Sequence, residues 1–303
     1  MTARREPALP VGTQVVLRAA GRDLDGAPVQ SGATGRVGAQ DGGRYTVELP
    51  DGRVVLCARG DVELRRRWQA QVALGDAALS GHQLVGQRTV YAAVVGSRAF
   101  GLDVDDSDTD VRGAFQAPTS SFWSLVKPPA HVEGPGPQQF SWELERFCEL
   151  ALKANPNLLE VLHSPLVLTC TPVGQELLDL RPAFLSRLAH TTYAGYVLSQ
   201  ARKLQADIRQ HGSPRWKHVM HLLRLLLAAA DLLRSGQMPL DVGPHRERLL
   251  EVKRGEVPWE EVERWRLRLQ SDVDEALRHS PLPEGPDVTA VDAWLASVRR
   301  RDL

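Results

Sequence analysis

The amino-acid sequence predicts an α+β protein with three parts: a small β-barrel-like module over residues 1–63, a mixed α/β core over 64–170 and a helical domain over 171–303. Three observations support this prediction. Short β-rich runs separated by Gly and Asp turns fill the first part. Strand and helix patterns alternate in the second part, and apolar residues recur with helical periodicity in the third. A chain of 303 residues is long enough for two or three domains with buried cores.

The N-terminal module is predicted from four short runs of β-forming residues, at 14–18, 34–37, 45–49 and 53–58. Turn sequences such as Asp51-Gly52 separate these runs, as expected for short strands joined by tight turns. The pattern resembles that of SH3-like barrels. Modules of this kind more often mediate contacts than chemistry, so we expect the reactive residues elsewhere in the chain.

The predicted core begins with a helix over residues 64–82, which starts with three arginines from Arg65 and stops at Gly81. Residues 88–166 then alternate strand and helix patterns, which indicates a compact α/β arrangement. Between residues 128 and 137 the chain is rich in Pro and Gly, and a loop is predicted there.

Helix signals dominate the last part of the chain. Asn155 and Pro156 have the residue types favoured at an N-cap and at the first helical position, and they predict a helix start within the core. Pro214 and Gly236 bracket one of the C-terminal helices in the same way. The predicted C-terminal helices cover residues 174–180, 183–211, 214–235, 244–254, 258–279 and 287–299.

The composition is that of an ordinary globular protein without an overall charge. Lys and Arg number 37 and Asp and Glu also number 37, so the formal net charge is zero. No overall field therefore attracts nucleic acid, and any basic surface must be local. Hydrophobic content of 43% and charged content of 24% are ordinary for soluble globular proteins.

Cysteine usage and the absence of long apolar runs bear on location. Cys57, Cys148 and Cys170 lie far apart without the spacing of a zinc site. A small odd number of cysteines is typical of a reducing compartment, so a cytoplasmic location is expected. The N-terminus lacks an apolar signal core, and no apolar run approaches transmembrane length, so no membrane partner is expected.

Residues 91–113 carry the strongest functional signal. An apolar run ends abruptly at Gly96-Ser97, and an acid-rich loop then leads to Asp108 and Asp110. Successive strand side chains point to opposite faces, so the two aspartates are predicted to project from the same face. Two neighbouring carboxylates suit a hard divalent cation such as Mg²⁺.

The turn before the aspartates suits a phosphate group. Gly96 lets the backbone approach a ligand closely, and Ser97 offers N–H and hydroxyl donors to a phosphate. Arg98 and Arg112 are expected to point away from their functional neighbours, Ser97 and Asp110, and Arg98 is expected to reach a triphosphate from the loop. Phosphate donors close to a carboxylate metal site indicate nucleotide chemistry.

A two-metal phosphoryl-transfer site needs a further carboxylate from a neighbouring strand. Glu143, which ends a short alternating run just before a predicted helix, is the favoured third acid, and Glu145 is its rival. The structural alternative is that Asp108 and Asp110 end a solvated acidic turn, since other aspartates precede them. The apolar strand and the Gly-Ser turn favour the metal site.

The helix that begins near Pro214 is the predicted nucleotide clamp. Lys217, His221 and Arg224 recur at i, i+4 and i+7, which places them on one helix face. A lysine can neutralise phosphate charge, and an arginine can bind two phosphate oxygens at once in a bidentate arrangement. An ordinary solvated helix face is the alternative. Glu160 is expected to pair with a nearby arginine.

These motifs together carry a family resemblance. GSRAFG, then SDTD and VRG, is similar to the nucleotidyltransferase superfamily of DNA polymerase beta. WELERF, LKANPN and the later run WKHVMHLLR resemble the bacterial RNA-repair-pathway polymerase-beta family over about residues 85–275. The resemblance implies a nucleotidyltransferase mixed-sheet core, with NTP as substrate and ATP as the favoured NTP. It also implies two Mg²⁺ ions, with Mn²⁺ as an alternative, held by Asp108, Asp110 and Glu143.

The implied reaction is transfer of NMP to an acceptor hydroxyl with release of pyrophosphate. RNA is the favoured acceptor, in repair or end modification. A protein or a small molecule is the alternative, including toxin-type modification of tRNA or protein. A non-catalytic binding module, in which the aspartates merely end a strand, is the competing hypothesis from a different functional class.

Overall fold

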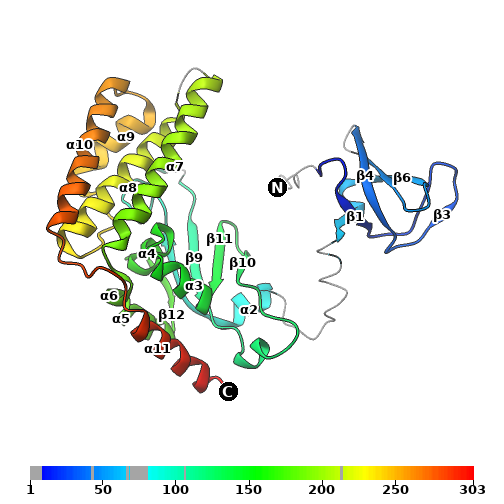
Figure 1. Ribbon diagram of the computed structural model, residues 1–303, viewed down its shortest axis with the longest axis horizontal. Helices are drawn as coiled ribbons and strands as arrows, with labels where there is room; N and C mark the ends of the chain where they lie inside the picture. The colour runs from blue at the N-terminus through cyan, green and yellow to red at the C-terminus, as the bar shows by residue number, and fades with distance from the viewer. Residues whose placement is uncertain (1–8, 42–43, 66–67, 69–80, 106, 212–213) are drawn as a thin grey trace. The chain divides into compact units, whose positions relative to one another are not determined.

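The structure is a computed structural model that describes residues 9–41, 44–65, 68, 81–105, 107–211 and 214–303. The chain divides into two units, residues 1–78 and residues 79–303, each with its own internal contacts. Figure 1 draws both units, and each is described by itself.

The N-terminal unit contains a five-stranded antiparallel sheet with the strand order β6-β5-β4-β1-β7. Alternate residues of its strands, such as Val15, Tyr45 and Val47, are buried in a separate small core. Among the described residues the edge strands β6 and β7 do not pair with each other, so the predicted closed barrel is not confirmed. The strands are β1 (Gln14–Leu17), β2 (Gly21–Arg22), β3 (Pro28–Val29), β4 (Thr34–Asp41), β5 (Arg44–Glu48), β6 (Val54–Ala58) and β7 (Val62–Leu64).

The second unit is built on a mixed sheet with the order β10-β11-β9-β8-β12. β11 pairs with β9 in parallel, and the other neighbouring strands pair antiparallel. β8 is apolar and buried over almost its whole length, as expected for a strand covered on both faces. The strands are β8 (Thr89–Val95), β9 (Asp110–Phe115), β10 (His131–Glu133), β11 (Gln139–Glu143) and β12 (Val167–Cys170).

Short helices pack on this sheet. Helix α4 starts as the sequence predicts, because Asn155 accepts a hydrogen bond of 3.0 Å from the backbone N–H of Asn157 and Pro156 occupies the first turn. Figure 1 shows α3 and α4 against the sheet. The helices are α2 (Gly81–Arg88), α3 (Leu144–Leu152), α4 (Pro156–His163), α5 (Pro172–Asp179) and α6 (Arg181–Phe184).

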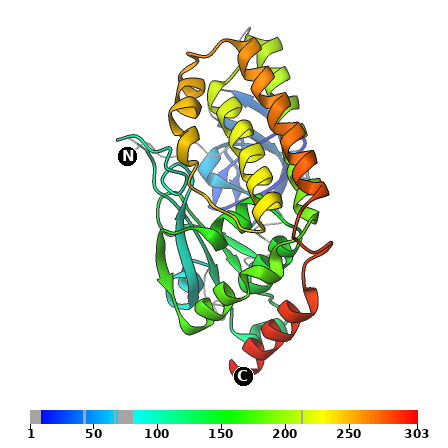
Figure 2. The same ribbon diagram turned by 90° about the vertical axis from the view of Figure 1, so that its left-hand side faces the viewer.

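The remaining helices follow the sequence prediction closely. Helix α8 lies between its neighbours and is buried over most of its length, which explains its run of leucines and alanines. Gly236 ends it with φ of 70°, in the left-handed region that favours glycine. Figure 2 shows α8, α9 and α10 side by side at one end of the unit. The helices are α7 (Leu188–His211), α8 (Trp216–Ser235), α9 (Arg246–Arg254), α10 (Trp259–Arg278) and α11 (Val288–Arg301).

Two predicted helices differ from the structure. The span 183–211 is divided between α6 and α7, and the helix predicted over 64–82 is the second. Most of the span 64–82 lies outside the described residues, and Gly81, its predicted stop, lies within α2 instead. Within the described part of the chain, no helix is both long enough and apolar enough to cross a lipid bilayer.

Candidate active site

A pocket of about 530 Å³ lies between the end of β8, the start of β9 and the N-terminal half of α8. It is lined by groups from four separate parts of the second unit: the β8–β9 connection with the start of β9, helix α7, the first turns of α8, and α9. These residues are Gly96, Ser97, Phe100, Leu102, Val104, Ser107, Asp108, Asp110, Gln200, Lys217, His218, Met220, His221, Arg224 and Lys253.

The turn after β8 forms one wall of the pocket. Gly96 has φ of 75°, a conformation that side-chain-bearing residues rarely adopt. A Cβ atom at this position would lie 2.9 Å from Asp110 Oδ2, so glycine is needed for the carboxylate to approach the backbone. The turn is closed by hydrogen bonds from the N–H of Phe100 to the Gly96 carbonyl, at 3.1 Å, and from the N–H of Leu102 to the Ser97 carbonyl, at 2.8 Å.

Asp108 and Asp110, predicted to project from one face of a strand, both line the pocket. Asp110 is the first residue of β9 and is half-buried, whereas Asp108 precedes the strand and is exposed. Both carboxylates therefore line the pocket, although only Asp110 belongs to the strand. Asp110 pairs with Val95 across β8 and β9, which puts it at the same end of the sheet as the Gly96 turn.

The two arginines flanking these motifs have different partners from those expected. Arg98 is exposed and donates a 2.9 Å hydrogen bond to the Ser107 carbonyl, so it braces the acidic loop and is not among the pocket-lining residues. The prediction that Arg112 points away from Asp110 is wrong, because side chains two residues apart on a strand project from the same face. Its Nη2 lies 3.2 Å from Asp110 Oδ1.

Helix α8 brings Lys217, His221 and Arg224 to the opposite wall of the pocket. Lys217 is exposed at the helix start, where the positive end of the helix dipole also favours an anion. Burial, reinforced by the nearby charge of Arg224, lowers the pKa of His221 to about 3. His221 is therefore neutral near pH 7 and lines the pocket without adding positive charge.

Arg224 differs most from the predicted clamp. It is 2% exposed, its Nη2 lies 2.8 Å from Glu160 Oε1, and its guanidinium lies 3.8 Å from the centre of the Phe100 ring. Glu160 therefore pairs with an arginine, as predicted, but that arginine is Arg224, which is also predicted to bind phosphate. Arg224 Nε has no hydrogen-bond partner among the described residues. Arg224 therefore joins Glu160 of α4 to Phe100, in the turn that follows Ser97.

The helical part of the unit holds this turn in several places. Arg246 at the start of α9 donates from Nε to the Gly101 carbonyl at 2.7 Å, and the N–H of Val242 donates to the Phe100 carbonyl at 3.1 Å. The Gly96-Ser97 turn is therefore anchored to the helices, although it follows a strand of the sheet. Lys253 on α9 also reaches the pocket, which sequence reasoning missed because nothing in its local pattern distinguishes it from a solvated helix residue.

Glu143 lies elsewhere, contrary to the prediction. It pairs in register with Phe115, five residues along β9 from Asp110. At about 3.3 Å per residue, that separation is about 16 Å, far beyond the reach of a shared metal ion. Glu145, the rival candidate, lies in the first turn of α3, and its Oε2 is 3.7 Å from Nη2 of Arg299, the same arginine that contacts Glu143.

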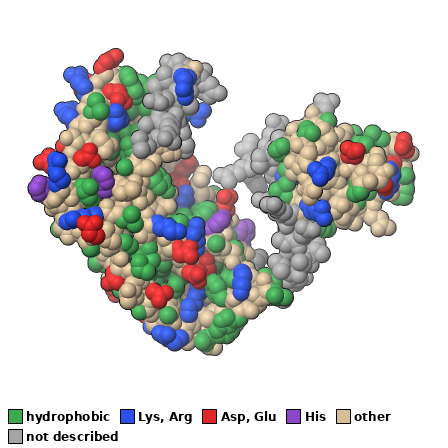
Figure 3. Space-filling view, in the orientation of Figure 1, with side chains coloured by type: hydrophobic (Ala, Val, Ile, Leu, Met, Phe, Trp, Pro, Cys, Tyr) green, Lys and Arg blue, Asp and Glu red, His purple; other side chains and the backbone are tan. Residues whose placement is uncertain are grey.

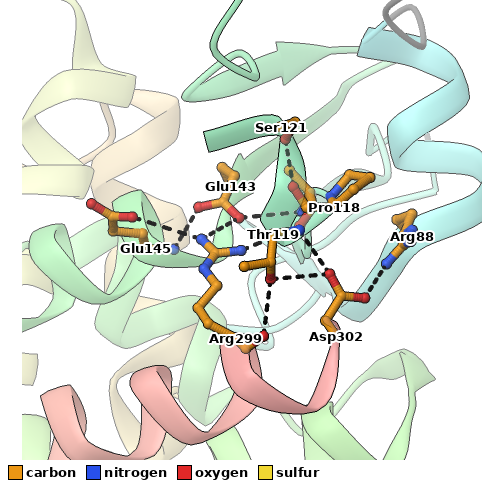
Figure 4. Close-up of polar contacts among 9 residues, drawn as sticks. Arg88, Pro118, Thr119, Ser121, Glu143, Glu145, Arg299 and Asp302 are labelled. Atoms are coloured by element: carbon orange, nitrogen blue, oxygen red, sulfur yellow. Dashed lines mark hydrogen bonds and ion pairs between the residues drawn. The ribbon is translucent and has the colours of Figure 1, made fainter. Parts of the chain in front are cut away.

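The partners of Glu143 explain its burial. It caps α3 by accepting from the N–H of Glu145 at 2.7 Å, and its other oxygen accepts from the N–H of Ala117 at 3.2 Å and from Arg299 Nη2 at 2.8 Å. Figure 4 shows Arg299 reaching from the C-terminal helix into this cluster. All these contacts are structural, and they leave Glu143 enclosed by protein groups.

The backbone before β11 lies close to the start of β9. Gln138, which has φ of 55°, directly precedes the first register pair, Gln139 with Val111. The Gln138 carbonyl accepts hydrogen bonds from the N–H of Val111, at 3.1 Å, and from Arg112 Nη1, at 2.6 Å. Within the described residues, no cluster of three His, Cys, Asp or Glu side chains can hold a metal ion.

Comparison with known proteins identifies the class and then the family. Residues 67–297 match the RNA repair pathway DNA polymerase beta family, and the chain belongs to that family. This confirms the resemblance drawn from the motifs and indicates a polymerase-beta-like nucleotidyltransferase. The match leaves out most of the N-terminal unit.

Two individual proteins are similar to this chain. The uncharacterized protein YcgL of Bacillus subtilis (strain 168) is 30% identical over 162 residues, which is 52% of this chain and 61% of YcgL. A crystal structure of a nucleotidyltransferase-like protein from Exiguobacterium sibiricum 255-15 is 14% identical and covers 71% of this chain and 75% of that one. Its TM-score is 0.26, a value at which a shared fold is not established.

Proposed function

We propose that this protein transfers NMP from an NTP, with ATP as the favoured nucleotide, to an acceptor hydroxyl and releases pyrophosphate. One observation carries the proposal: the Gly96-Ser97 turn, Asp108, Asp110 and two lysines from separate helices line the same pocket. A solvated acidic turn would not need a glycine in the left-handed region packed against one of its carboxylates, nor lysines facing it.

The triphosphate would lie along the turn and the start of α8. Backbone N–H groups at a glycine-containing turn and at a helix N-terminus suit phosphate oxygens. Lys217 and Lys253, from different helices, would neutralise the β and γ groups, where negative charge accumulates as pyrophosphate leaves. Arg224 would act indirectly, by supporting Phe100 beneath the turn.

Asp108 and Asp110 would supply only some of the oxygen ligands of Mg²⁺, and the substrate phosphates would supply others. Mg²⁺ prefers oxygen ligands and is usually bound through one or two carboxylates together with substrate phosphates. Asp108 and Asp110 supply those carboxylates, with Mn²⁺ as an alternative ion. When bound there, the metal would neutralise phosphate charge and polarise the reacting phosphoryl group. The arrangement of two ions bridged to Glu143 is not part of this proposal, because Glu143 lies at the other end of the strand.

The remaining roles belong to residues that orient the carboxylates. Arg112 contacts Asp110 Oδ1, while Oδ2 is the oxygen that faces Gly96 and the pocket wall. The acceptor oxygen would form a bond to the α-phosphorus as the bond between the α-phosphorus and the bridging oxygen breaks. Asp108 or Asp110 would receive the hydroxyl proton, directly or through water.

RNA is the favoured acceptor, since the family is named for an RNA repair pathway. A protein or small-molecule hydroxyl would use the same chemistry, including toxin-type modification of tRNA or protein. A cytoplasmic location is part of the proposal and agrees with three free cysteines.

The test is transfer of label from each α-³²P-NTP, with Mg²⁺ and total RNA, by wild type and by Asp108→Asn and Asp110→Asn variants. Wild type should label an acceptor, and each variant should lose at least about a hundredfold in rate, the size of effect seen when a preorganised charge is removed. Equal labelling by all three proteins would contradict the proposal. Metal-independent NTP binding with no transfer to any acceptor would instead favour the non-catalytic binding module.

A further inference from the structure

The sheet order defines the side from which an acceptor would approach. In phosphoryl transfer the attacking and leaving oxygens lie roughly in line on opposite sides of the phosphorus. The proposed pyrophosphate side is the Ser97 turn, which follows β8. Asp110 begins β9, and β11 and β10 lie beyond β9, away from β8. The acceptor would therefore come from the β11–β10 side of the aspartates.

Three aromatic rings occupy that side of the sheet, on the same face as Asp110. Arg112, two residues after Asp110, pairs in register with Phe140 of β11. Trp142 is two residues further along β11, and His131 of β10 pairs in register with it. Register partners and residues two apart share a sheet face. We call His131, Phe140 and Trp142 the aromatic strip.

The rings of the aromatic strip are in contact. The His131 and Phe140 centroids are 5.2 Å apart with planes inclined by 13°, which is a stacked arrangement. Phe140 and Trp142 are 4.7 Å apart, and Trp142 meets the buried ring of Phe147 edge-on at 6.2 Å. Trp142 thus joins the strip to the core. His131 is exposed and Phe140 is only half-buried, so the outer end of the strip faces solvent.

Stacked aromatic rings with accessible faces suit nucleobases. Base–aromatic stacking tolerates any sequence because every base has a π-face, and unpaired bases are the ones available to stack. Figure 3 shows histidine side chains at the surface over β10 and β11, with Lys and Arg interspersed with Asp and Glu over this face of the unit. Without a broad basic patch on this face, stacking rather than phosphate contact would provide most of the affinity.

We propose that the aromatic strip binds the unpaired terminal base of a single-stranded RNA acceptor and presents its terminal hydroxyl to Asp110. The inference rests on the proposed function for its direction and deepens it by naming the acceptor as single-stranded RNA. Arg112, between Phe140 and Asp110 on this face, lies where the acceptor's last sugar and phosphate would pass.

The test measures binding without turnover. A fluorescently labelled oligoribonucleotide with 2-aminopurine as its 3′-terminal nucleotide is titrated with the full-length protein, without NTP or Mg²⁺. Anisotropy reports affinity and 2-aminopurine quenching reports stacking. His131→Ala and Phe140→Leu should each weaken binding about five- to 100-fold and reduce the quenching, the range expected for loss of one stacking contact.

The matched control is Trp123→Leu. Trp123 is 71% exposed and follows the short helix η2 (Thr119–Phe122), beyond the end of β9 opposite to Asp110. This variant should bind and quench as wild type does. Binding of ATP with Mg²⁺, measured by equilibrium dialysis, should be unchanged in all three variants and thereby show that they are folded.

The outcomes separate this inference from the proposed function. Wild-type affinity and quenching in both strip variants would overturn the aromatic strip as the acceptor site, even if NMP transfer requires Asp110. Binding without any 2-aminopurine quenching would overturn it too. Absence of NMP transfer by wild type would refute the proposed function, while the binding data would still decide whether the strip stacks on a base. Transfer to a protein hydroxyl, with no RNA binding, would contradict the inference alone.

Discussion

Arg299 Nη2 lies 2.8 Å from Glu143 Oε1, and this contact joins the C-terminal helix α11 to the end of strand β11. Both side chains are largely enclosed, at 14% and 4% exposure. Burial raises the pKa of the Glu143 carboxyl above its usual range, although Arg299 opposes the shift. Beside them, Asp302 accepts hydrogen bonds from Arg88 and Thr119, as Figure 4 shows. Glu143 is therefore a structural anchor for the C-terminal helix.

Because the contact between Arg299 and Glu143 lies away from the pocket, we expect changes to these residues to affect stability rather than catalysis. Arg299→Met removes the partner of a buried carboxylate and should lower the free energy of unfolding by about 3 kcal/mol, as measured by urea denaturation. Arg300→Met, at an exposed position on the same helix, should change it by less than about 0.5 kcal/mol. Glu143→Gln should retain most NMP transfer per folded molecule. If Glu143→Gln abolished transfer while leaving stability unchanged, Glu143 would have a catalytic role after all.

The Gly96 turn predicts a second, local effect. Gly96→Ala places a side chain in the left-handed region and puts its Cβ against Asp110 Oδ2. We expect a loss of about 1–2 kcal/mol in unfolding free energy and a fall of more than tenfold in transfer rate. Gly195→Ala is the control, because the residue is helical and no described atom outside its own helix backbone lies within 4 Å of a Cβ there; its stability should be equal or higher. Normal activity in Gly96→Ala would show that the turn does not position Asp110.

The two pocket lysines predict changes in nucleotide affinity. Lys217→Met and Lys253→Met should each raise the KM for NTP about tenfold, because a charge-assisted hydrogen bond to phosphate contributes about 1.5–3 kcal/mol. Lys153→Met, at the exposed C-cap of α3, is the matched control and should leave the KM unchanged. Steady-state kinetics with varied NTP at saturating acceptor distinguishes these variants. An unchanged KM in both pocket variants would place the triphosphate elsewhere.

His221 predicts part of the acid sensitivity of the fold. Its pKa is about 3 in the folded protein, lower than the ordinary histidine value near 6.5, so the unfolded chain binds more protons between these values. Stability from this residue is complete above about pH 6.5 and declines as pH falls, by up to about 1.4 kcal/mol per pH unit. His221→Gln should therefore show a shallower loss of unfolding free energy between pH 6.5 and 4 than wild type does. Parallel curves for the two proteins would contradict a neutral buried His221.

Local patterns accounted for much of the architecture and part of the site. A strand buried on both faces consists of a continuous apolar run, so the run before Gly96 predicts β8. The end of this run at Gly96 predicts the turn. The leucine-rich pattern of α8, bracketed by Pro214 and Gly236, likewise predicts the helix whose start lines the pocket. Arg112 shares a face with Asp110, because side chains two residues apart on a strand project from the same side, and the opposite direction predicted for it is wrong.

Long-range relationships were not accessible in the same way. Glu143 was chosen because it ends a strand beside a helix, but parallel pairing sets it level with Phe115 rather than Asp110. A strand's register depends on its neighbours, and a shift of a few residues moves a carboxylate by more than the span of a metal site. Arg224 was chosen for its helical spacing, which carries no information about Glu160 on another helix.

The sequence by itself determined the family, the positions of helices α8 to α11, and the pairing of a Gly-Ser turn with two aspartates. These features depend on residues close together in the chain, where periodicity and turn chemistry act. Only the tertiary structure decided which charged groups face the pocket and which neutralise each other inside the protein. Lys253 faces the pocket and Glu143 does not, because burial and ion pairing are set by contacts between residues distant in the chain.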